Sequence, residues 1–412
     1  MLTAPERDII IALSEEYMKY ALLPVQKEKI NLWKALNRSK MERPMVAIDQ
    51  LPWHELVCPE LTASVSDPYW VNVERNLRQK IYMWKNFPVD MVLDPFISIP
   101  EPYHMTGYGI RADVTFLGQE DSTAKSQHYA NLISKIDDIS EIRDFRISPA
   151  PEALRAVQAQ ANDLYGKNIP YRMTGHSFNL GIWDYITTWM SVESLLDAFY
   201  DDPELLHAVI SRTTDSTIAA IEDVNACGAA NDISNVCHCS YIYTDDLLPD
   251  SGLGKGRNTG NCWASGTAQL FTSISPAMFE EFEIPYISQM AGYFAYIYYG
   301  CCDKLDDRLD AVKRIPNVRK VSCSPWSDRE NFAKKIGQEL IMSVKPSPAQ
   351  VATVNFDEGQ IKGDLTLSCE LARQNGVNIE FILKDVSTVR NDPARLTRWA
   401  DIAMEVADRF GR

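Results

Sequence analysis

Two groups of cysteine residues in this 412-residue sequence could bind a soft metal ion. One is Cys237-His238-Cys239, and the other is the adjacent pair Cys301-Cys302. Thiolate sulfur and imidazole nitrogen are ligands that zinc prefers in proteins, and a catalytic zinc takes three protein ligands and keeps one open position. The chain has nine cysteines, and an odd number in a long chain favours reduced thiols over a disulfide scaffold.

The pair Cys301-Cys302 is the sharper candidate because it follows an apolar run. Residues 294–299 are apolar and aromatic, and Gly300 allows a tight turn before the thiols. We therefore predict that Cys301, Cys302 and His238 bind zinc. Successive side chains of a strand alternate between its faces, so His238 and its two neighbouring cysteines should not all point into one pocket. A packed strand of buried thiols is the alternative.

Two adjacent carboxylates, Asp245 and Asp246, follow the apolar segment 239–244. Carboxylates at a strand end can act as a general base, hold a substrate hydroxyl or bind a metal ion. Together with His238 they are the predicted catalytic residues. Helix capping or solvation in a loop would explain the two carboxylates equally well.

Four further residues are predicted to contact the substrate. His176 lies where a strand ends, Trp183 offers an aromatic wall, Tyr299 directly precedes Gly300, and Asp49 ends the apolar run 45–48. Such residues suit an aromatic ligand that carries a phenolic or ether oxygen. A histidine in the core or in a loop is the alternative for His176.

Short apolar runs alternate with helical stretches from residue 44 onward, after 40 residues that are helical apart from a break at Pro24. Repeated strand–helix units predict an α/β fold, a (β/α)8 TIM-type barrel at 44–412 with an N-terminal helical extension at 1–43. The active site of such a barrel lies at the carboxyl ends of its strands. A doubly wound open sheet is the competing architecture. The predicted strands cover residues 45–48, 91–93, 294–299, 318–321, 340–344 and 379–383.

The acidic composition argues against nucleic acid as a partner. The sequence has 41 Lys and Arg against 56 Asp and Glu, a net charge of −15, which repels phosphate backbones. No stretch approaches the roughly 20 apolar residues of a membrane span. The first eight residues lack the basic and apolar segments of a signal peptide. We therefore expect a cytoplasmic protein with no membrane partner.

The segment Tyr299-Gly300-Cys301-Cys302-Asp303 resembles the uroporphyrinogen decarboxylase-like superfamily, in particular its corrinoid-dependent methyltransferase branch. The resemblance runs from about residue 44 to the C-terminus, and it rests on the order and spacing of several motifs. The other motifs are Ile274-Ser275-Pro276-Ala277-Met278-Phe279 with Pro285-Tyr286, Tyr243-Thr244-Asp245-Asp246-Leu247, Ser324-Pro325-Trp326, Lys345-Pro346-Ser347-Pro348 and Leu383-Lys384-Asp385-Val386-Ser387-Thr388-Val389.

Within this superfamily the chain most resembles the methyltransferase component of anaerobic aryl-ether O-demethylases. The resemblance implies a barrel enzyme that moves the methyl group of a methoxylated aromatic compound to the cob(I)alamin of a separate corrinoid protein. It also implies zinc, held partly by Cys301, to stabilise oxygen as the C–O bond breaks. The expected partners are a small aromatic methyl ether and the corrinoid protein. A homodimer is an open alternative to a monomer.

The sequence also departs from its relatives. Tyr299 stands where methyltransferases of the family have histidine, and Asp385 and Ser387 occupy the region of their late zinc-binding cysteine, which argues against an enzyme that methylates thiols. No arginine follows Arg43 near the first strand, which argues against porphyrinogen decarboxylation. The remaining alternatives are a related methyltransferase with a non-aromatic donor, another decarboxylase of the superfamily, and a barrel that only binds a ligand.

Overall fold

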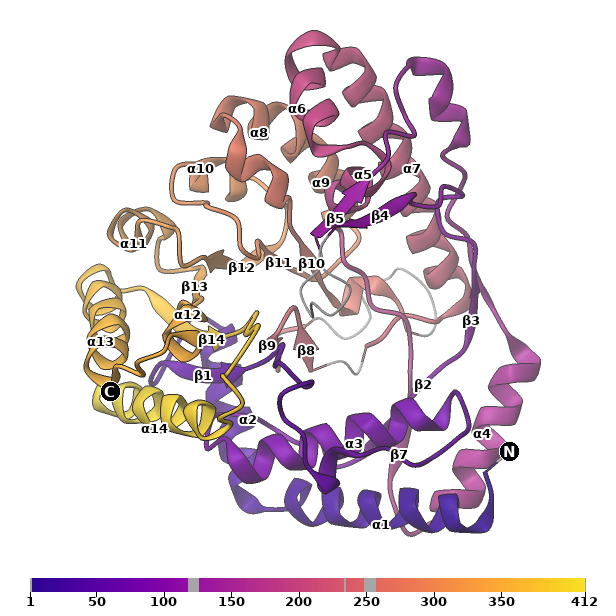
Figure 1. Cartoon of the computed structure of the whole chain (residues 1–412), viewed down its shortest axis with the longest axis vertical. Coiled ribbons are helices and arrows are strands. Elements are labelled where there is room, and N and C mark those ends of the chain that lie inside the picture. The colour runs from indigo at the N-terminus through magenta and orange to yellow at the C-terminus, as the bar shows by residue number, and fades with distance from the viewer. Residues whose placement is uncertain (1, 118–125, 233–234, 248–256, 412) are drawn as a thin grey trace.

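The computed structural model describes residues 2–117, 126–232, 235–247 and 257–411. Its centre is a sheet of six parallel strands in the order β1-β14-β13-β12-β11-β10. The sheet curls, and helices from the second half of the chain surround its outer face (Figure 1). The six strands are β1 (Met45–Ile48), β10 (Trp263–Gly266), β11 (Tyr296–Tyr299), β12 (Val318–Cys323), β13 (Ile341–Val344) and β14 (Asn378–Leu383).

Helices connect these strands, as the alternating sequence pattern predicts. Asp328 and Asp357 cap two of them by accepting hydrogen bonds from the backbone N–H groups of the first turn. The helices of the second half are α8 (Pro276–Phe282), α9 (Ile284–Ala291), α10 (Leu309–Val312), α11 (Arg329–Ile336), α12 (Ala349–Ala352), α13 (Glu358–Asn375) and α14 (Ala394–Arg409).

The predicted closed barrel of eight strands is corrected by the strand pairing. β2 (Ile97–Pro100) and β7 (Tyr171–Thr174) form a separate parallel pair. A single bridge, between Asn179 and Ser265, links the segment after β7 to β10. Among the described residues the main sheet therefore has six strands, and the architecture is an α/β half-barrel. The prediction of an α/β fold with a parallel sheet is confirmed.

The strands in the first half of the chain differ from those predicted from the sequence, whereas helices at 192–199 and about 204–226, expected from the periodicity, are present as α6 and α7. The segment 91–93, predicted as a strand, is not one, and the chain pairs later, in β2. Short antiparallel pairs join β3 (Tyr103–Met105) to β6 (Ile147–Pro149), β4 (Val114–Leu117) to β5 (Ser126–Tyr129), and β8 (Val236–Cys237) to β9 (Ser240–Tyr241). The helices here are α3 (Trp70–Asn86), α4 (Pro151–Tyr165), α5 (Ile182–Trp189), α6 (Val192–Asp201) and α7 (Pro203–Cys227).

Alternation along the central strands separates two environments. In β14, Ile379 and Phe381 pack against the helices, whereas Glu380 and Ile382 point into the curl of the sheet. The interior therefore receives polar side chains as well as apolar ones. The hairpin β8–β9 lies within this curl (Figure 1).

The helix α2 (Pro24–Asn37) closes the amino end of the curl, and the preceding helix α1 (Ala4–Ala21) packs against α3 and α4. The predicted helical start of the chain, with its break at Pro24, is confirmed. Trp33 is fully buried and packs near Met45, the first residue of β1, and its Nε1 donates to the carbonyl oxygen of Asp90 at 2.8 Å. None of the described helices has the length and apolar character that a membrane crossing requires.

Candidate active site

A tight turn places two thiols at the carboxyl end of β11. Gly300 has φ +92°, and a Cβ there would lie 2.6 Å from Leu305 Cδ1, so no other residue fits without a shift. Ser322 Oγ donates to the carbonyl oxygen of Cys301 at 2.7 Å and fixes the turn to β12. Cys301 and Cys302 therefore lie at the edge where a barrel carries its active site.

Asp385, from the carboxyl end of β14, joins the two thiols. Its Oδ2 accepts from Cys302 Sγ at 3.1 Å, and the two sulfurs lie 3.8 Å apart. One ligand atom from each residue lies within 4.8 Å of the other two. In the sheet β12 and β13 lie between β11 and β14, so in a flat sheet these ends would be about 14 Å apart. The curl of the sheet brings them together.

Positive charge surrounds Cys301. Lys384 Nζ, almost fully buried, donates to Cys301 Sγ at 2.8 Å. The hydrogen bond between the two thiols, followed by the interactions with His238 and Lys384, lowers the pKa of Cys301. The same hydrogen bond raises the pKa of Cys302. The surroundings therefore favour the thiolate form at Cys301 and the protonated form at Cys302.

A buried carboxyl group, Asp303, and a half-buried one, Asp184, lie near Cys301. Burial raises the pKa of Asp303 to about 7 and that of Asp184 to about 6, and the negative charge of Cys301 adds to both shifts. Thr267 Oγ1 donates to both carboxylate oxygens of Asp303, at 3.1 and 3.0 Å. Carboxyl groups whose pKa values are raised toward neutrality suit acid–base chemistry.

His238 reaches the site from the tip of the β8–β9 hairpin. His238 and Cys239 form the turn, with φ of 44° and 71°, which is uncommon for residues other than glycine. The expected continuous strand is therefore wrong here, and the turn sends the two side chains in different directions. His238 lies beside Cys301 and packs edge-on against Tyr298, with ring centroids 5.5 Å apart. Cys239 interacts with the carboxylate of Asp49.

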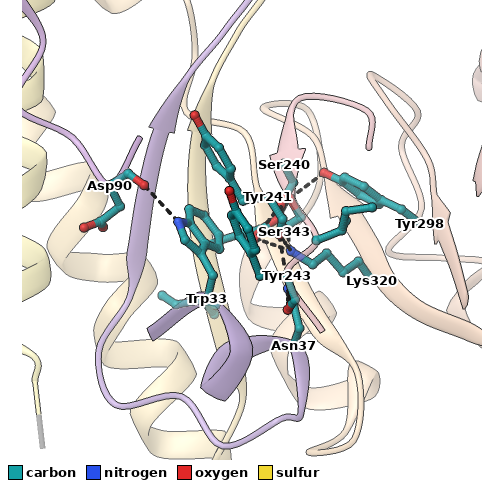
Figure 2. Close-up of polar contacts among 12 residues, drawn as sticks. Trp33, Asn37, Asp90, Ser240, Tyr241, Tyr243, Tyr298, Lys320 and Ser343 are labelled. Carbon is teal, nitrogen blue, oxygen red and sulfur yellow. Dashed lines mark hydrogen bonds and ion pairs between the residues drawn. The ribbon is translucent and has the colours of Figure 1, made fainter. Parts of the chain in front are cut away.

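A buried ion pair holds the hairpin in place. Lys320 Nζ lies 2.7 Å from Glu380 Oε2 and donates to Ser240 Oγ, also at 2.7 Å. Ser240, the first residue of β9, in turn donates to Glu380 Oε2 at 2.9 Å. All three side chains are buried. Because Ser240 is two residues from His238, these bonds set the position of the hairpin tip (Figure 2).

A second set of polar contacts lies beside this ion pair. Ser343 Oγ donates to Glu380 Oε1 at 2.6 Å and lies 2.6 Å from the hydroxyl oxygen of Tyr298 (Figure 2). Lys345 Nζ donates to Ser343 Oγ at 2.7 Å and also to the hydroxyl of Tyr298. Burial lowers the pKa of Lys345 to about 8. The ring against which His238 packs is thus itself held by hydrogen bonds.

Asp245 and Asp246 lie at the other end of the sheet, which corrects their predicted place in the site. After the turn the chain runs back toward the amino ends of the strands, where Asn37 Nδ2 donates to the carbonyl oxygen of Tyr243 at 2.8 Å (Figure 2). Asp245 then pairs with Arg38 at 3.3 Å, and Asp246 with the Arg319 guanidinium at 3.3 Å. The segment ends at this edge because β9 is antiparallel to β8.

The predicted substrate contacts are divided among different places. Asp49 lies at the site, beside Cys239. His176 packs against Phe178, with ring centroids 4.7 Å apart. Trp183 and Tyr299 are fully buried among the helices, where Tyr299 donates to Glu283. The structure therefore brings Asp49 to Cys239, whereas Trp183, on α5, packs against Phe271, and Tyr299 points to Glu283 among the helices.

A cavity of about 260 Å³ adjoins His238. It lies between the hairpin, β10 and the segment that follows β7. Phe178 and Trp263 give it aromatic walls, and Ile242 adds an aliphatic one. The remaining described lining residues are Ser177, Asn179, Asn231, Asp232, Asn235, Val236, Cys237, Thr244, Leu247, Asn261, Cys262 and Ser265.

The buried charged residues of the site were not predicted from the sequence. Lys320 and Glu380 each stand at inward positions of central strands, and Lys345 and Lys384 directly follow β13 and β14. A charge between two apolar residues of a strand is the signal that could have revealed Glu380, because charged residues are almost never fully buried unless paired. Lys320 follows Arg319, so it gives no such signal.

The sequence matches no protein family model, and it is similar to no curated protein sequence. Among solved structures, a methyltransferase from Methanosarcina mazei is similar in fold. The match covers 90% of this chain and 97% of that chain, with a TM-score of 0.50 and 10% sequence identity. The two chains share a fold.

Proposed function

We propose that the protein is a methyltransferase that moves the methyl group of a small aromatic methyl ether to the cob(I)alamin of a separate corrinoid protein. The observation that carries this proposal is the cluster of Cys301, Cys302 and Asp385 beside His238. The likeness of the fold to a methyltransferase supports it.

The donor atoms of this cluster fit zinc. Two sulfurs and one carboxylate oxygen lie close enough to bind one ion, and the surroundings of Cys301 favour its thiolate form. Asp385 takes the place where the relatives have a late cysteine, so it replaces His238 as the third proposed ligand. When bound, zinc would supply a Lewis acid that stabilises negative charge on the ether oxygen.

The residues of the chain then have distinct tasks. Phe178 and Trp263 hold the aromatic ring in the cavity, and His238 lies between the cavity and Cys301. During transfer the methyl C–O bond breaks, a bond forms between the methyl carbon and the electron pair of the acceptor, and the oxygen leaves with the bonding electrons as a phenolate. His238, which lines the cavity, is placed to donate a hydrogen bond to that oxygen as it leaves.

A methyl-transfer assay tests this proposal. The full chain is supplied with zinc, cob(I)alamin and a methoxylated aromatic compound without oxygen, and the loss of the cob(I)alamin absorbance is followed. We expect transfer from the wild type, a loss of about 100-fold or more in His238→Ala, and none in Cys301→Ser. His128→Ala, at an exposed strand position, is the control. Transfer from non-aromatic donors alone, or from none, would overturn the proposal.

A further inference from the structure

The cavity beside His238 contains polar atoms that no residue satisfies. Asn231 Oδ1, Asn261 Oδ1 and His238 Nε2 are buried and lack a hydrogen-bond partner among the described residues. All three residues line this one cavity. Buried polar atoms without a partner are rare and costly in native proteins, so a group that satisfies several of them at once would bind here with a gain in free energy.

The two amide oxygens can only accept hydrogen bonds. The Asn231 side chain already uses its Nδ2, which donates to Ser177 Oγ at 3.0 Å, so its oxygen is the atom left for a ligand. A ligand that complements these oxygens must bring a donor. A hydroxyl group does so, whereas a carboxylate or a bare ether does not.

The charges around the cavity disfavour an anion. None of the described residues that line it is lysine or arginine, and one of them, Asp232, is a carboxylate. Arg257 and Arg172, which do not line the cavity, interact electrostatically with Asp232, and their positive charges weaken the attraction of that carboxylate for a cation. The lysines of the site face Cys301 and Glu380 instead. An uncharged ligand therefore suits the cavity better than a carboxylated or a cationic one.

We infer that this cavity binds an uncharged aromatic ligand with a free hydroxyl group, a methoxyphenol in preference to a methoxybenzoate. The ring lies between Phe178 and Trp263, and the hydroxyl donates its one hydrogen bond to the amide oxygen of Asn261 or of Asn231. Only one part of this inference rests on the proposed function, namely that the ligand carries a methoxy group. It names the substrate class from the lining of the cavity.

Calorimetric titration of the full, zinc-supplied chain tests the ligand class directly. The probes are 2-methoxyphenol, methoxybenzene, 4-hydroxy-3-methoxybenzoate and tetramethylammonium. We expect 2-methoxyphenol to bind about tenfold or more tightly than each of the other three, which corresponds to one well-placed hydrogen bond or one avoided charge. Equal or tighter binding of the benzoate or of tetramethylammonium would overturn the inference, and so would the absence of binding by 2-methoxyphenol.

Two substitutions at one position sharpen the test. Asn261→Leu removes an acceptor, so the preference for 2-methoxyphenol over methoxybenzene should fall to about threefold or less. Asn261→Lys adds a cation, so the benzoate should gain about tenfold or more in affinity. Asn355→Lys, at an exposed position away from the cavity, is the matched control and should leave both ratios unchanged. Unaltered ratios in both folded Asn261 variants would contradict the inference.

The methyl-transfer assay on the same preparations separates this inference from the proposed function. Selective binding of 2-methoxyphenol without any methyl transfer would overturn the proposed function and support the ligand class. Methyl transfer together with equal binding of 2-methoxyphenol and 4-hydroxy-3-methoxybenzoate would support the proposed function and overturn the inferred ligand class.

Discussion

Lys320 Nζ lies 2.7 Å from Glu380 Oε2, and neither side chain is exposed to solvent. The two residues belong to β12 and β14, so the ion pair spans the intervening strand β13 on the inner face of the sheet. Ser240 of the hairpin hydrogen-bonds to both. The pair therefore joins the sheet to the segment that carries His238.

Loss of Lys320 should destabilise the fold strongly. Lys320→Met leaves the Glu380 carboxylate buried without its partner, and we expect a loss of about 3–5 kcal/mol in the free energy of unfolding, measured by denaturant titration. The double variant with Glu380→Met should lose less than the single one. Lys334→Met removes an exposed pair with Glu330, which solvent screens, so it should change the stability far less than Lys320→Met. A loss from Lys320→Met no larger than this control would contradict the prediction.

Zinc content should depend on the cluster of Cys301, Cys302 and Asp385. We expect about one zinc per wild-type chain by mass spectrometry, no zinc in Cys301→Ser, and weaker binding in Asp385→Asn. Cys227→Ser changes an exposed thiol elsewhere and should retain the metal. Full zinc occupancy in Cys301→Ser would remove this residue from the metal site, and a wild type without zinc after metal supply would exclude the site as a whole.

Asp245 and Asp246 should contribute little to turnover. Both lie at the amino ends of the strands in partly exposed ion pairs with Arg38 and Arg319. Asp245→Ala and Asp246→Ala should each cost about 0–1 kcal/mol in stability and leave kcat and KM within about twofold of the wild type. If kcat fell about 100-fold in a folded variant, the prediction would be wrong and that carboxylate would take part in catalysis.

The stability of the fold should depend on pH through Glu283. Burial raises the pKa of Glu283 to about 8, from 4.5 when it is exposed. Between these values the folded chain holds a proton that the unfolded chain releases, so the free energy of unfolding falls as pH rises through the window and levels off above pH 8. Glu283→Gln keeps an acceptor for the Tyr299 hydroxyl and removes the titration.

Thermal unfolding measured between pH 5 and pH 9, in steps of about one pH unit, tests whether the free energy of unfolding falls as pH rises. The stability of Glu283→Gln relative to the wild type should increase with pH, by on the order of a few kcal/mol across the range. Glu15→Gln, at an exposed helical position, should show no such trend. A constant difference between Glu283→Gln and the wild type would show that Glu283 does not titrate in this range.

The thiols could be predicted from the sequence because their position depends on local signals. An apolar run followed by Gly300 indicates a strand and a turn, and such a turn at the end of a parallel strand leads to the active edge. The same reasoning places Asp49 correctly after β1. Helices with Asp caps and glycine ends were predictable for the same reason.

The hairpin could not be predicted in this way. β8 and β9 have two residues each, too few for a periodic pattern, and the turn uses His238 and Cys239 in place of the glycine or asparagine that normally marks such a bend. Without the turn, the sequence pattern predicts that Asp245 follows a strand toward the active edge. The role of Asp385 depends on the curl of the sheet, which no local pattern encodes.

The anchoring of the hairpin also has a consequence for how the chain reaches its native state. Ser240 bonds to a residue 140 positions later, and Asn37 to one 206 positions later. Contacts between such distant residues form slowly, because a long loop must close before they stabilise anything. During synthesis the hairpin therefore lacks its hydrogen bond to Glu380 until β14, the last strand, has been made. When β14 docks, Glu380 and Asp385 arrive together, so the anchored His238 and the completed metal ligands are products of one late folding step.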